Sequence, residues 1–347
     1  MRNNYGSFVD EIETEKRRAS SRLPAFVLLV LLFGYAAFPL RRVQQQPALS
    51  VTTSSKNTTG SPSPVPFQRY CVENVCLTAS NGYERKLGRA VANGLFEGII
   101  LELYQETTVE VDAEDDTVCE RVVFEDSSDT LSVDFNDKCT MSVTATAVGN
   151  YTVTAVVGSA AASHRSTRTV EFHVVAKYVR REVRDLDIAD KNRYLDAIAV
   201  THSVSDEVGM RKYGEQYKST YWFARLHNIW SKDRECDHWH ASSGFMNQHI
   251  AFALRFEKAL QSVDPRTCVH YWDYTIDVAA GVECCWTESD LFSPSFFSTI
   301  NPNNTLRIVD TGRWAYTRIE KVMSGSPQSN SYGLLGVPWN TNPTPFV

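Results

Sequence analysis

The chain has 347 residues, of which 43% are hydrophobic and 22% charged, so it is long enough for about two folded domains. Its formal net charge of -6 at pH 7 is spread without long runs of like charge. This distribution gives no reason to expect a nucleic-acid partner.

The first predicted element is the apolar run at residues 23–40, which contains no charged residue. As a helix it would be roughly 27 Å long, close to the ~30 Å hydrocarbon core of a bilayer. More basic residues precede the run than follow it: Lys16, Arg17, Arg18 and Arg22 against Arg41 and Arg42. The pattern predicts a transmembrane signal anchor with residues 1–22 as a cytoplasmic tail, in a single-pass type II orientation with the bulk of the chain luminal or extracellular. A cleaved signal peptide, ending near Gly34 to Ala36, is the alternative and would give a secreted protein.

Two further motifs agree with an oxidising, luminal environment. Glycosylation acceptor sequences begin at Asn57, Asn150 and Asn303, which predicts a glycoprotein. The eight cysteines form an even set that such an environment would pair into disulfides. Connectivity is not fixed by the sequence, but Cys119 and Cys139 flank predicted strands in one domain and are expected to pair.

Residues 41–66 are rich in Gln, Ser, Thr and Pro, which predicts a stalk. Residues 67–177 contain short runs of β-branched and aromatic residues with a period of two, typical of strands. The runs lie at residues 107–111, 118–124, 130–135, 141–147, 151–157 and 170–175. Strands this close together, without helices between them, predict an antiparallel, immunoglobulin-like β-sandwich domain. His164 and His173 fall here and are expected to be surface or structural residues.

From residue 178 onward the period is helical. The segment Asp187 to Asp190 resembles a capping box and opens the first helical pattern. A second pattern at residues 221–230 places Phe223, His227 and Trp230 on one side. A third runs from Phe245 through His249 to Val263 and is ended by Asp264 and Pro265.

Five of the eight histidines fall within residues 227–270, at positions 227, 238, 240, 249 and 270. A single histidine on an apolar helix face is more often a hydrogen-bonded core residue than a ligand. A cluster of this density instead predicts a metal site. Neutral imidazoles suit copper, zinc or iron, and the spacing alone does not choose among them.

The wider context of the cluster resembles the first copper motif of the tyrosinase, catechol oxidase and hemocyanin family of type-3 copper proteins. His240, Phe245, His249 and Glu257 are followed by the segment Tyr271-Trp-Asp-Tyr-Thr275. The resemblance covers residues 178–347 and implies a mainly α copper-binding domain with an incomplete helix bundle. It implies one copper ion from this chain, against a pair in a complete family member. Its ligands are His227, His240 and His249, with His238 as the alternative to His240.

The resemblance also implies roles around the metal. Asp273 is expected to be structural, Phe245 and Phe256 to line an apolar shell, and His270 not to bind metal. Some family members link a cysteine two residues before the middle histidine to its ring. Cys236 stands two residues before His238 but four before His240, so the link is not expected with His240 as the ligand.

Two departures affect the expected function. Gln248 and Ile250 flank His249, where the family usually has Trp and Arg. No histidine follows His270, whereas the family's second copper needs a His-x3-His pair and one more histidine. If residues beyond Val347 supply that motif, the resemblance implies an oxidoreductase that converts mono- or diphenols to ortho-quinones with O₂. The alternative is a non-catalytic, membrane-anchored copper-binding or cell-surface interaction protein. This chain alone is expected to bind at most one copper and to have little or no diphenolase activity.

Overall fold

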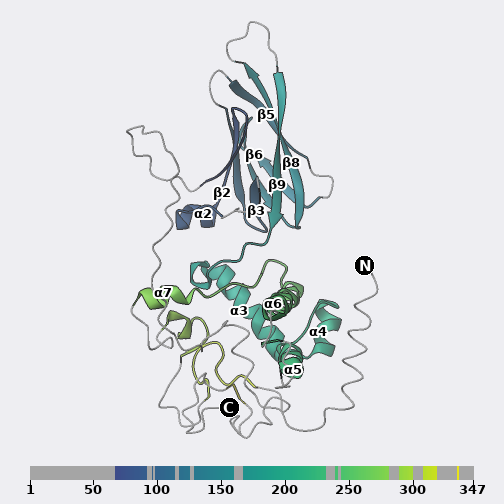
Figure 1. Ribbon diagram of the computed structural model, residues 1–347, viewed down its shortest axis with the longest axis vertical. Helices are drawn as coiled ribbons and strands as arrows, with labels where there is room; N and C mark the ends of the chain where they lie inside the picture. Colours follow the sequence, from purple (N-terminus) through teal and green to yellow (C-terminus); the bar gives the residue numbers. More distant parts are fainter. Residues whose placement is uncertain are drawn as a thin grey trace. The chain divides into compact units, whose positions relative to one another are not determined.

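The computed structural model describes residues 67–91, 96, 98–113, 117–125, 129–159, 167–231, 239–240, 244–280, 289–299, 308–318 and 334–335. These residues form two compact units, and the chain passes from one to the other between Arg181 and Glu182. The N-terminal unit is built of strands and the C-terminal unit mainly of helices and loops (Figure 1).

The N-terminal unit contains two sheets. The five-stranded sheet has the order β1-β2-β4-β7-β6, and the four-stranded sheet has the order β3-β9-β8-β5. The strands are β1 (Gln68–Val72), β2 (Val75–Asn81), β3 (Ile99–Glu102), β4 (Thr107–Ala113), β5 (Thr117–Glu125), β6 (Leu131–Phe135), β7 (Thr140–Ala145), β8 (Gly149–Ser159) and β9 (Thr167–Lys177). Neighbouring strands are antiparallel, except that β3 pairs with β9 in parallel.

The core of this unit follows from the alternation of side chains along each strand. In β8, Tyr151, Val153, Ala155 and Val157 are buried, and the residues between them are less so. They join buried residues of both sheets in one hydrophobic cluster. The six predicted strands are observed as β4 to β9, whereas β1 to β3 and the short helix α2 (Gly82–Leu87) were not predicted.

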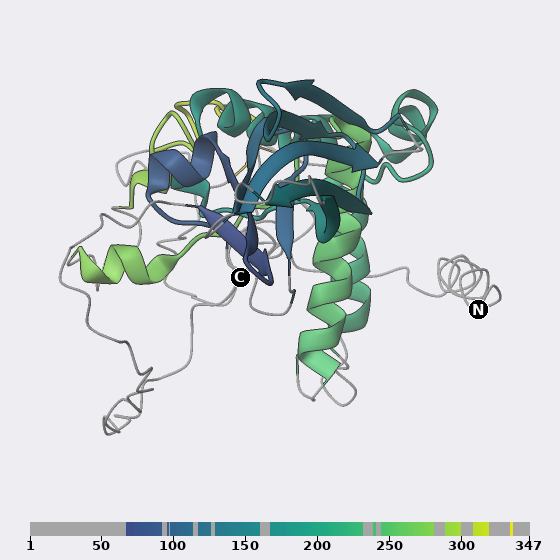
Figure 2. The same ribbon diagram turned by 90° about the horizontal axis from the view of Figure 1, so that it is seen from above.

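The C-terminal unit begins with a short 3₁₀ helix, η1 (Val183–Asp185). Within the described residues, five helices follow: α3 (Ile188–Ser203), α4 (Asp206–Tyr213), α5 (Thr220–Ser231), α6 (Gly244–Val263) and α7 (Tyr274–Ala279). The 3₁₀ turn η3 (Asp290–Phe292) lies after them. The longest of these helices, α6, is seen along its length in Figure 2.

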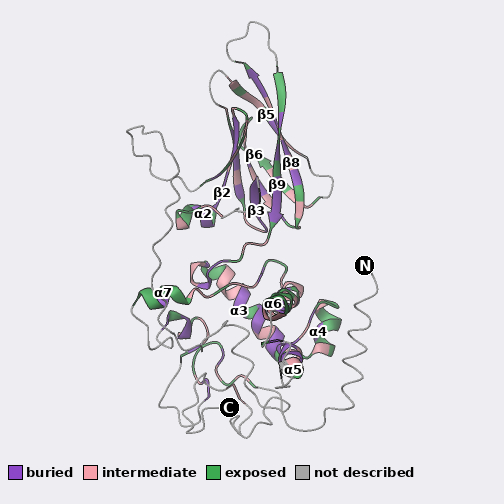
Figure 3. Cartoon of the chain, viewed as in Figure 1, coloured by how far each residue is buried: buried purple, intermediate pink, exposed green. Residues whose placement is uncertain are grey.

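The core of this unit lies where α3, α5 and α6 pack on one another. Leu195, Phe223 and Leu260, one from each helix, are fully buried. Most residues of α4 and α7 are exposed, whereas α3 and α6 each have a buried face (Figure 3). The helical period therefore marks the side of each long helix that faces the core.

The predicted fold class was wrong in its mainly α C-terminal part. After α6, the described residues contain only α7, η3 and loops, with isolated bridges between Glu182 and Tyr271 and between Arg318 and Leu334. The described chain is a mixed fold of sheets and helices. The helical period was strong only as far as Val263, and the later residues are rich in Pro, Ser and Asn, which favour turns.

The predicted transmembrane anchor and type II location are also corrected. Within the ranges given above, no helix is both long and apolar enough to cross a bilayer. The tail, anchor and stalk predicted for residues 1–66 lie outside the described residues, as do Asn57 and Asn303. An apolar run gives the length and polarity of a segment, which is not enough to establish a membrane-spanning helix. Glycosylation at Asn150, which is exposed in β8, stays a prediction.

Candidate metal centre

Helices α5 and α6 each bring one histidine to a common point. His227 lies on α5 one turn after Phe223, on the face that packs into the core, and is only 6% exposed. His249 lies on α6 one turn before Phe252 and two turns before Phe256, both of which are buried. Because residues three or four apart share a helix face, burying the aromatic residues also orients the two imidazoles.

A third histidine, His240, completes the group from the segment between the two helices. The ring of His240 lies 5.0 Å from that of His227 and 5.4 Å from that of His249, measured between centroids. One ligand nitrogen from each of the three rings lies within 4.8 Å of the others. His240 is exposed, so the group is closed on its His227 side and open on its His240 side.

The spacing of the nitrogens fits a single small metal ion. Nε2 of His227 and Nε2 of His240 are 3.3 Å apart. Two imidazoles that bind one ion at about 2.0–2.1 Å with tetrahedral angles have their nitrogens roughly 3.3–3.4 Å apart. The donor set is three neutral imidazoles without a carboxylate, which suits copper or zinc better than magnesium or calcium.

The backbone of α6 selects the ligand nitrogen of His249. Nδ1 of His249 lies 2.9 Å from the carbonyl oxygen of Phe245. A carbonyl can only accept, so we assign the proton of the neutral ring to Nδ1, which leaves Nε2 free to bind metal. Such a hydrogen bond also fixes the orientation of the imidazole ring and makes the opposite nitrogen a better electron-pair donor to a metal ion.

Aromatic side chains surround the imidazoles. The ring centroid of Trp239 lies 5.4 Å from that of His227 and 5.4 Å from that of His249. The ring centroid of Phe252 lies 6.0 Å from that of His227. Phe245 lies 4.3 Å from His249, in agreement with the expected apolar shell. Phe256 instead packs against Phe223, at 5.2 Å, and supports the helix pair. The shell limits access of water to the buried side of the group.

The Trp-Asp segment that follows α6 has a structural role. The Asp273 carboxylate caps α7 by accepting from the backbone N–H of Thr275, at 3.0 Å, as the sequence predicted. Trp272 donates from Nε1 to the Asp277 carboxylate at 2.6 Å, and Arg184 donates to the same carboxylate at 2.8 Å. Arg184 therefore links η1 to α7. The sequence could not predict this contact, because Arg184 and Asp277 are 93 residues apart in the chain.

Glu257 fixes the chain just after α6. It is 7% exposed, and its carboxylate accepts from the backbone N–H of Val269 at 2.9 Å. A buried carboxylate is stable only when it is bonded in this way. The contact helps to hold the start of the Trp-Asp segment against the helix that carries His249.

The remaining candidate residues are apart from the group. His270 packs edge to face on Tyr194, with ring centroids 4.9 Å apart, and is not one of the converging histidines. His173 is exposed in β9. His238, the alternative ligand, lies outside the described residues, as do Cys236 and His164. Sequence reasoning missed Trp239 and Phe252, although their positions beside His240 and one turn after His249 were a usable signal.

The described residues thus bring together three imidazoles, held mainly by two packed helices and lined by aromatic residues, in an arrangement that could hold one metal ion. Residues 194–342 match the family model described as the common central domain of tyrosinase. The chain therefore contains part of a domain that is similar to the tyrosinase central domain, over less than half of its length.

Known proteins with similar sequences agree with this family. The chain is 34% identical over 84 residues to a tyrosinase of Streptomyces lincolnensis, covering 22% of this chain and 28% of that protein. It is 50% identical over 38 residues to grixazone synthase of Streptomyces griseus subsp. griseus, covering 11% and 12%. It is 34% identical over 71 residues to a tyrosinase of Streptomyces antibioticus, covering 20% and 23%. The matched part is thus less than a third of each relative.

Proposed function

We propose that His227, His240 and His249 bind one copper ion and form the first half of a two-copper oxidase centre. The observation that carries the proposal is the convergence of three imidazole nitrogens within 4.8 Å of one another. The Nδ1–H bond from His249 to the Phe245 carbonyl adds to it, because it leaves Nε2 of that ring available.

The protein side chains would fix the metal and restrict water. Bound copper would supply reversible electron transfer and a site for O₂. His227 is buried against Trp239 and Phe252 and so forms the rigid side of the site. His240 is exposed and faces the side from which a second metal-binding half and a substrate could approach.

The proposed reaction is the oxidation of mono- or diphenols to ortho-quinones with O₂. In the diphenol reaction, each of two substrate molecules loses two electrons and two protons. One O₂ molecule takes up these four electrons and four protons and gives two water molecules. A four-electron reduction of this kind requires a second copper, held by a second set of three imidazoles.

The surface of α6 supports an approach of further helices. Met246, Ile250 and Leu254 are four residues apart and therefore share one side of α6. They are 60%, 53% and 45% exposed, which is unusual for a row of large apolar residues. The row lies on the helix that carries His249, so helices that cover it would lie next to the metal.

A second candidate function is copper binding without catalysis. It is favoured by the three-imidazole group among the described residues, because such a group can hold one copper ion by itself. The coding sequence past Val347 separates the two functions. A His-x3-His pair with a later histidine supports the oxidase, whereas a stop codon supports copper binding alone.

The proposal is tested by loading the purified chain with copper and measuring both stoichiometry and catechol oxidation. We expect about one copper per chain and little or no quinone formation by this chain, since one set of three imidazoles holds one ion. Two coppers per chain, or rapid quinone formation, would contradict the half-centre. Absence of copper binding would reject both candidate functions.

A further inference from the structure

The tip of the β1–β2 hairpin carries a disulfide between residues that face each other directly. Cys71 pairs with Cys76 in the antiparallel register, and the next pair, Val72 with Val75, ends the ladder. The bridge joins residues that are only 5 positions apart in the sequence, whereas the Cys119–Cys139 bridge joins residues that are 20 positions apart. A cross-link across a short loop that is already held by strand pairing adds little stability. The loop-closure entropy that a disulfide removes from the unfolded chain grows with loop length.

The two cysteines of this bridge differ in how far the residue is exposed. Cys71 is exposed on the edge strand β1, whereas Cys76 on β2 is only 2% exposed. A thiol from solution can therefore reach the sulfur of Cys71 but not that of Cys76. In thiol–disulfide exchange the attacked sulfur is retained in the new bond and the other sulfur leaves as a thiolate.

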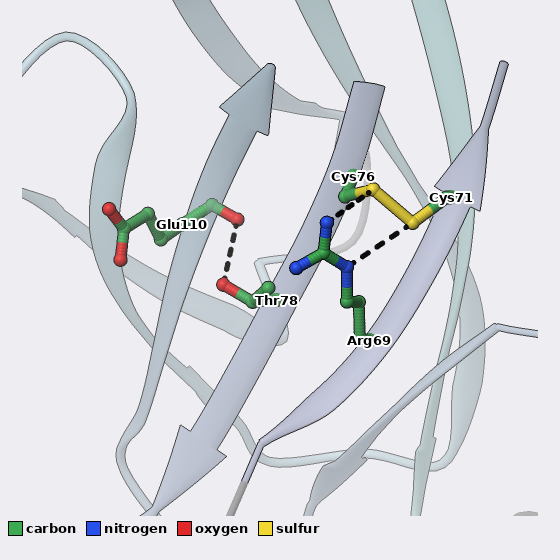
Figure 4. The surroundings of a disulfide bond; sticks show 5 residues. All are labelled: Arg69, Cys71, Cys76, Thr78 and Glu110. Carbon is green, nitrogen blue, oxygen red and sulfur yellow. Dashed lines mark hydrogen bonds between the residues drawn. A yellow bond between two sulfur atoms is a disulfide. The ribbon is translucent and has the colours of Figure 1, made fainter. Parts of the chain in front are cut away.

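The side chain of Arg69 lies across the bridge (Figure 4). Its Nε is 3.5 Å from the Cys71 sulfur, and a terminal guanidinium nitrogen is 3.2 Å from the Cys76 sulfur. In the same view, the carboxylate of Glu110 on the next strand points away from the bridge. A fixed positive charge at this distance stabilises a thiolate that forms on Cys76.

The second bridge in the unit has a different setting. At Cys139 the adjacent Asp137 carboxylate accepts from the Cys139 backbone N–H at 2.7 Å. Cys76 is paired across the strands with Asp112, so each bridge has an acidic residue nearby, and the contact of Arg69 with both sulfur atoms is what sets the Cys71–Cys76 bridge apart. The two bridges therefore form an internal comparison within one folded unit.

We propose that the Cys71–Cys76 bridge is a site of reversible exchange with small anionic thiols. A thiolate attacks the exposed Cys71 sulfur, forming a mixed disulfide and breaking the bridge, and the electron pair of the broken bond goes to the Cys76 sulfur beside Arg69. A second thiolate then attacks the mixed disulfide, releasing the small disulfide and the Cys71 thiolate. Two thiols thus supply two electrons and two protons to the bridge. The Arg69 charge also attracts an anionic thiol to this surface.

Reduction would release a covalent link at the edge of the five-stranded sheet without unfolding the unit. β1 is the edge strand of that sheet, and Gln68 at its other end bonds to both backbone groups of Ile100, at 2.8 and 2.7 Å. These bonds and the strand ladder remain when the bridge opens. The modification is therefore local to the hairpin tip.

The test treats the full chain with glutathione, quenches with acid, alkylates free thiols and measures each cysteine by peptide mass spectrometry. We expect the Cys71–Cys76 bridge to be reduced about tenfold or more faster than Cys119–Cys139. The glutathione adduct should appear on Cys71. Equal rates for the two bridges, or an adduct on Cys76, would overturn the proposal.

Two variants isolate the part played by the charge. Arg69→Gln should slow reduction of the Cys71–Cys76 bridge about tenfold. Arg121→Gln removes an exposed arginine two residues from Cys119 and should not change the reduction rate of the Cys71–Cys76 bridge. An Arg69→Gln effect no larger than that of Arg121→Gln would overturn the role of Arg69. Cysteamine, a cationic thiol, should react more slowly than glutathione at equal thiolate concentration, and equal rates would overturn the preference for anionic thiols.

Discussion

Replacement of Phe223 by alanine tests whether the α5–α6 contact determines the metal site. Phe223 is fully buried and makes edge-to-face contacts with Phe252 at 5.3 Å and Phe256 at 5.2 Å. Loss of a buried phenylalanine costs about 3–5 kcal/mol, including the cavity that remains. A domain of this kind has a stability of about 5–15 kcal/mol, so the variant should lose about a fifth of it or more.

The change should also weaken copper binding, because Phe223 lies one turn before His227 and supports Phe252, which contacts the His227 ring. We expect a tenfold to hundredfold lower affinity, about the effect of removing a residue that orients a ligand. Urea unfolding followed by tryptophan fluorescence measures the stability. All seven tryptophans lie after residue 221, so the signal reports on the C-terminal unit.

The matched control is Tyr274→Ala, at an aromatic position in the same unit that is 57% exposed. Its free energy of unfolding should stay within about 0.5 kcal/mol of the unchanged protein. A loss below about 1 kcal/mol in Phe223→Ala, or copper affinity equal to that of the control, would refute the reasoning.

Two further predictions concern stability. Gly209→Ala places a Cβ 1.9 Å from the Tyr217 ring and should lower the free energy of unfolding by about 1–3 kcal/mol. Gly82→Ala is the control and should be nearly neutral, because a Cβ at Gly82 has no other atom within 4 Å. Equal thermal unfolding of the two variants would contradict this prediction. Burial lowers the pKa of His202 below its usual 6.5, so the unfolded chain takes up the proton at a higher pH and stability should fall as pH drops below about 6.5. His202→Gln should flatten this dependence in urea unfolding, and an unchanged slope would count against it.

The sequence predicted the elements whose side chains alternate cleanly. The period of two in Tyr151 to Val157 and the helical period from Phe245 to Val263 both describe one buried face, and β8 and α6 are observed there. β2 was missed because Ser80 and Asn81 are buried as well as the apolar residues, which hides the alternation. Asn81 is buried because it caps α2, accepting from the Glu84 N–H at 3.0 Å.

The histidine cluster was visible in the sequence, but its geometry was not. Spacing along the chain placed His249 and Phe252 on one helix face, whereas the meeting of that face with His227 depends on how α5 packs on α6. Register and pairing between distant segments, such as the parallel contact of β3 with β9, depend on the whole fold. The apolar run at residues 23–40 shows the opposite error, in which hydropathy alone was given more weight than it supports.

The central claim is tested most directly by the copper content of the full chain and of His249→Ala, measured by mass spectrometry of the metal after dialysis. The account predicts about one copper per unchanged chain and near-complete loss in His249→Ala, because two remaining imidazoles leave the ion weakly held. His173→Ala, at an exposed histidine in β9, should keep the full copper content. A His249→Ala variant with the same copper content as His173→Ala would contradict the assignment of the site.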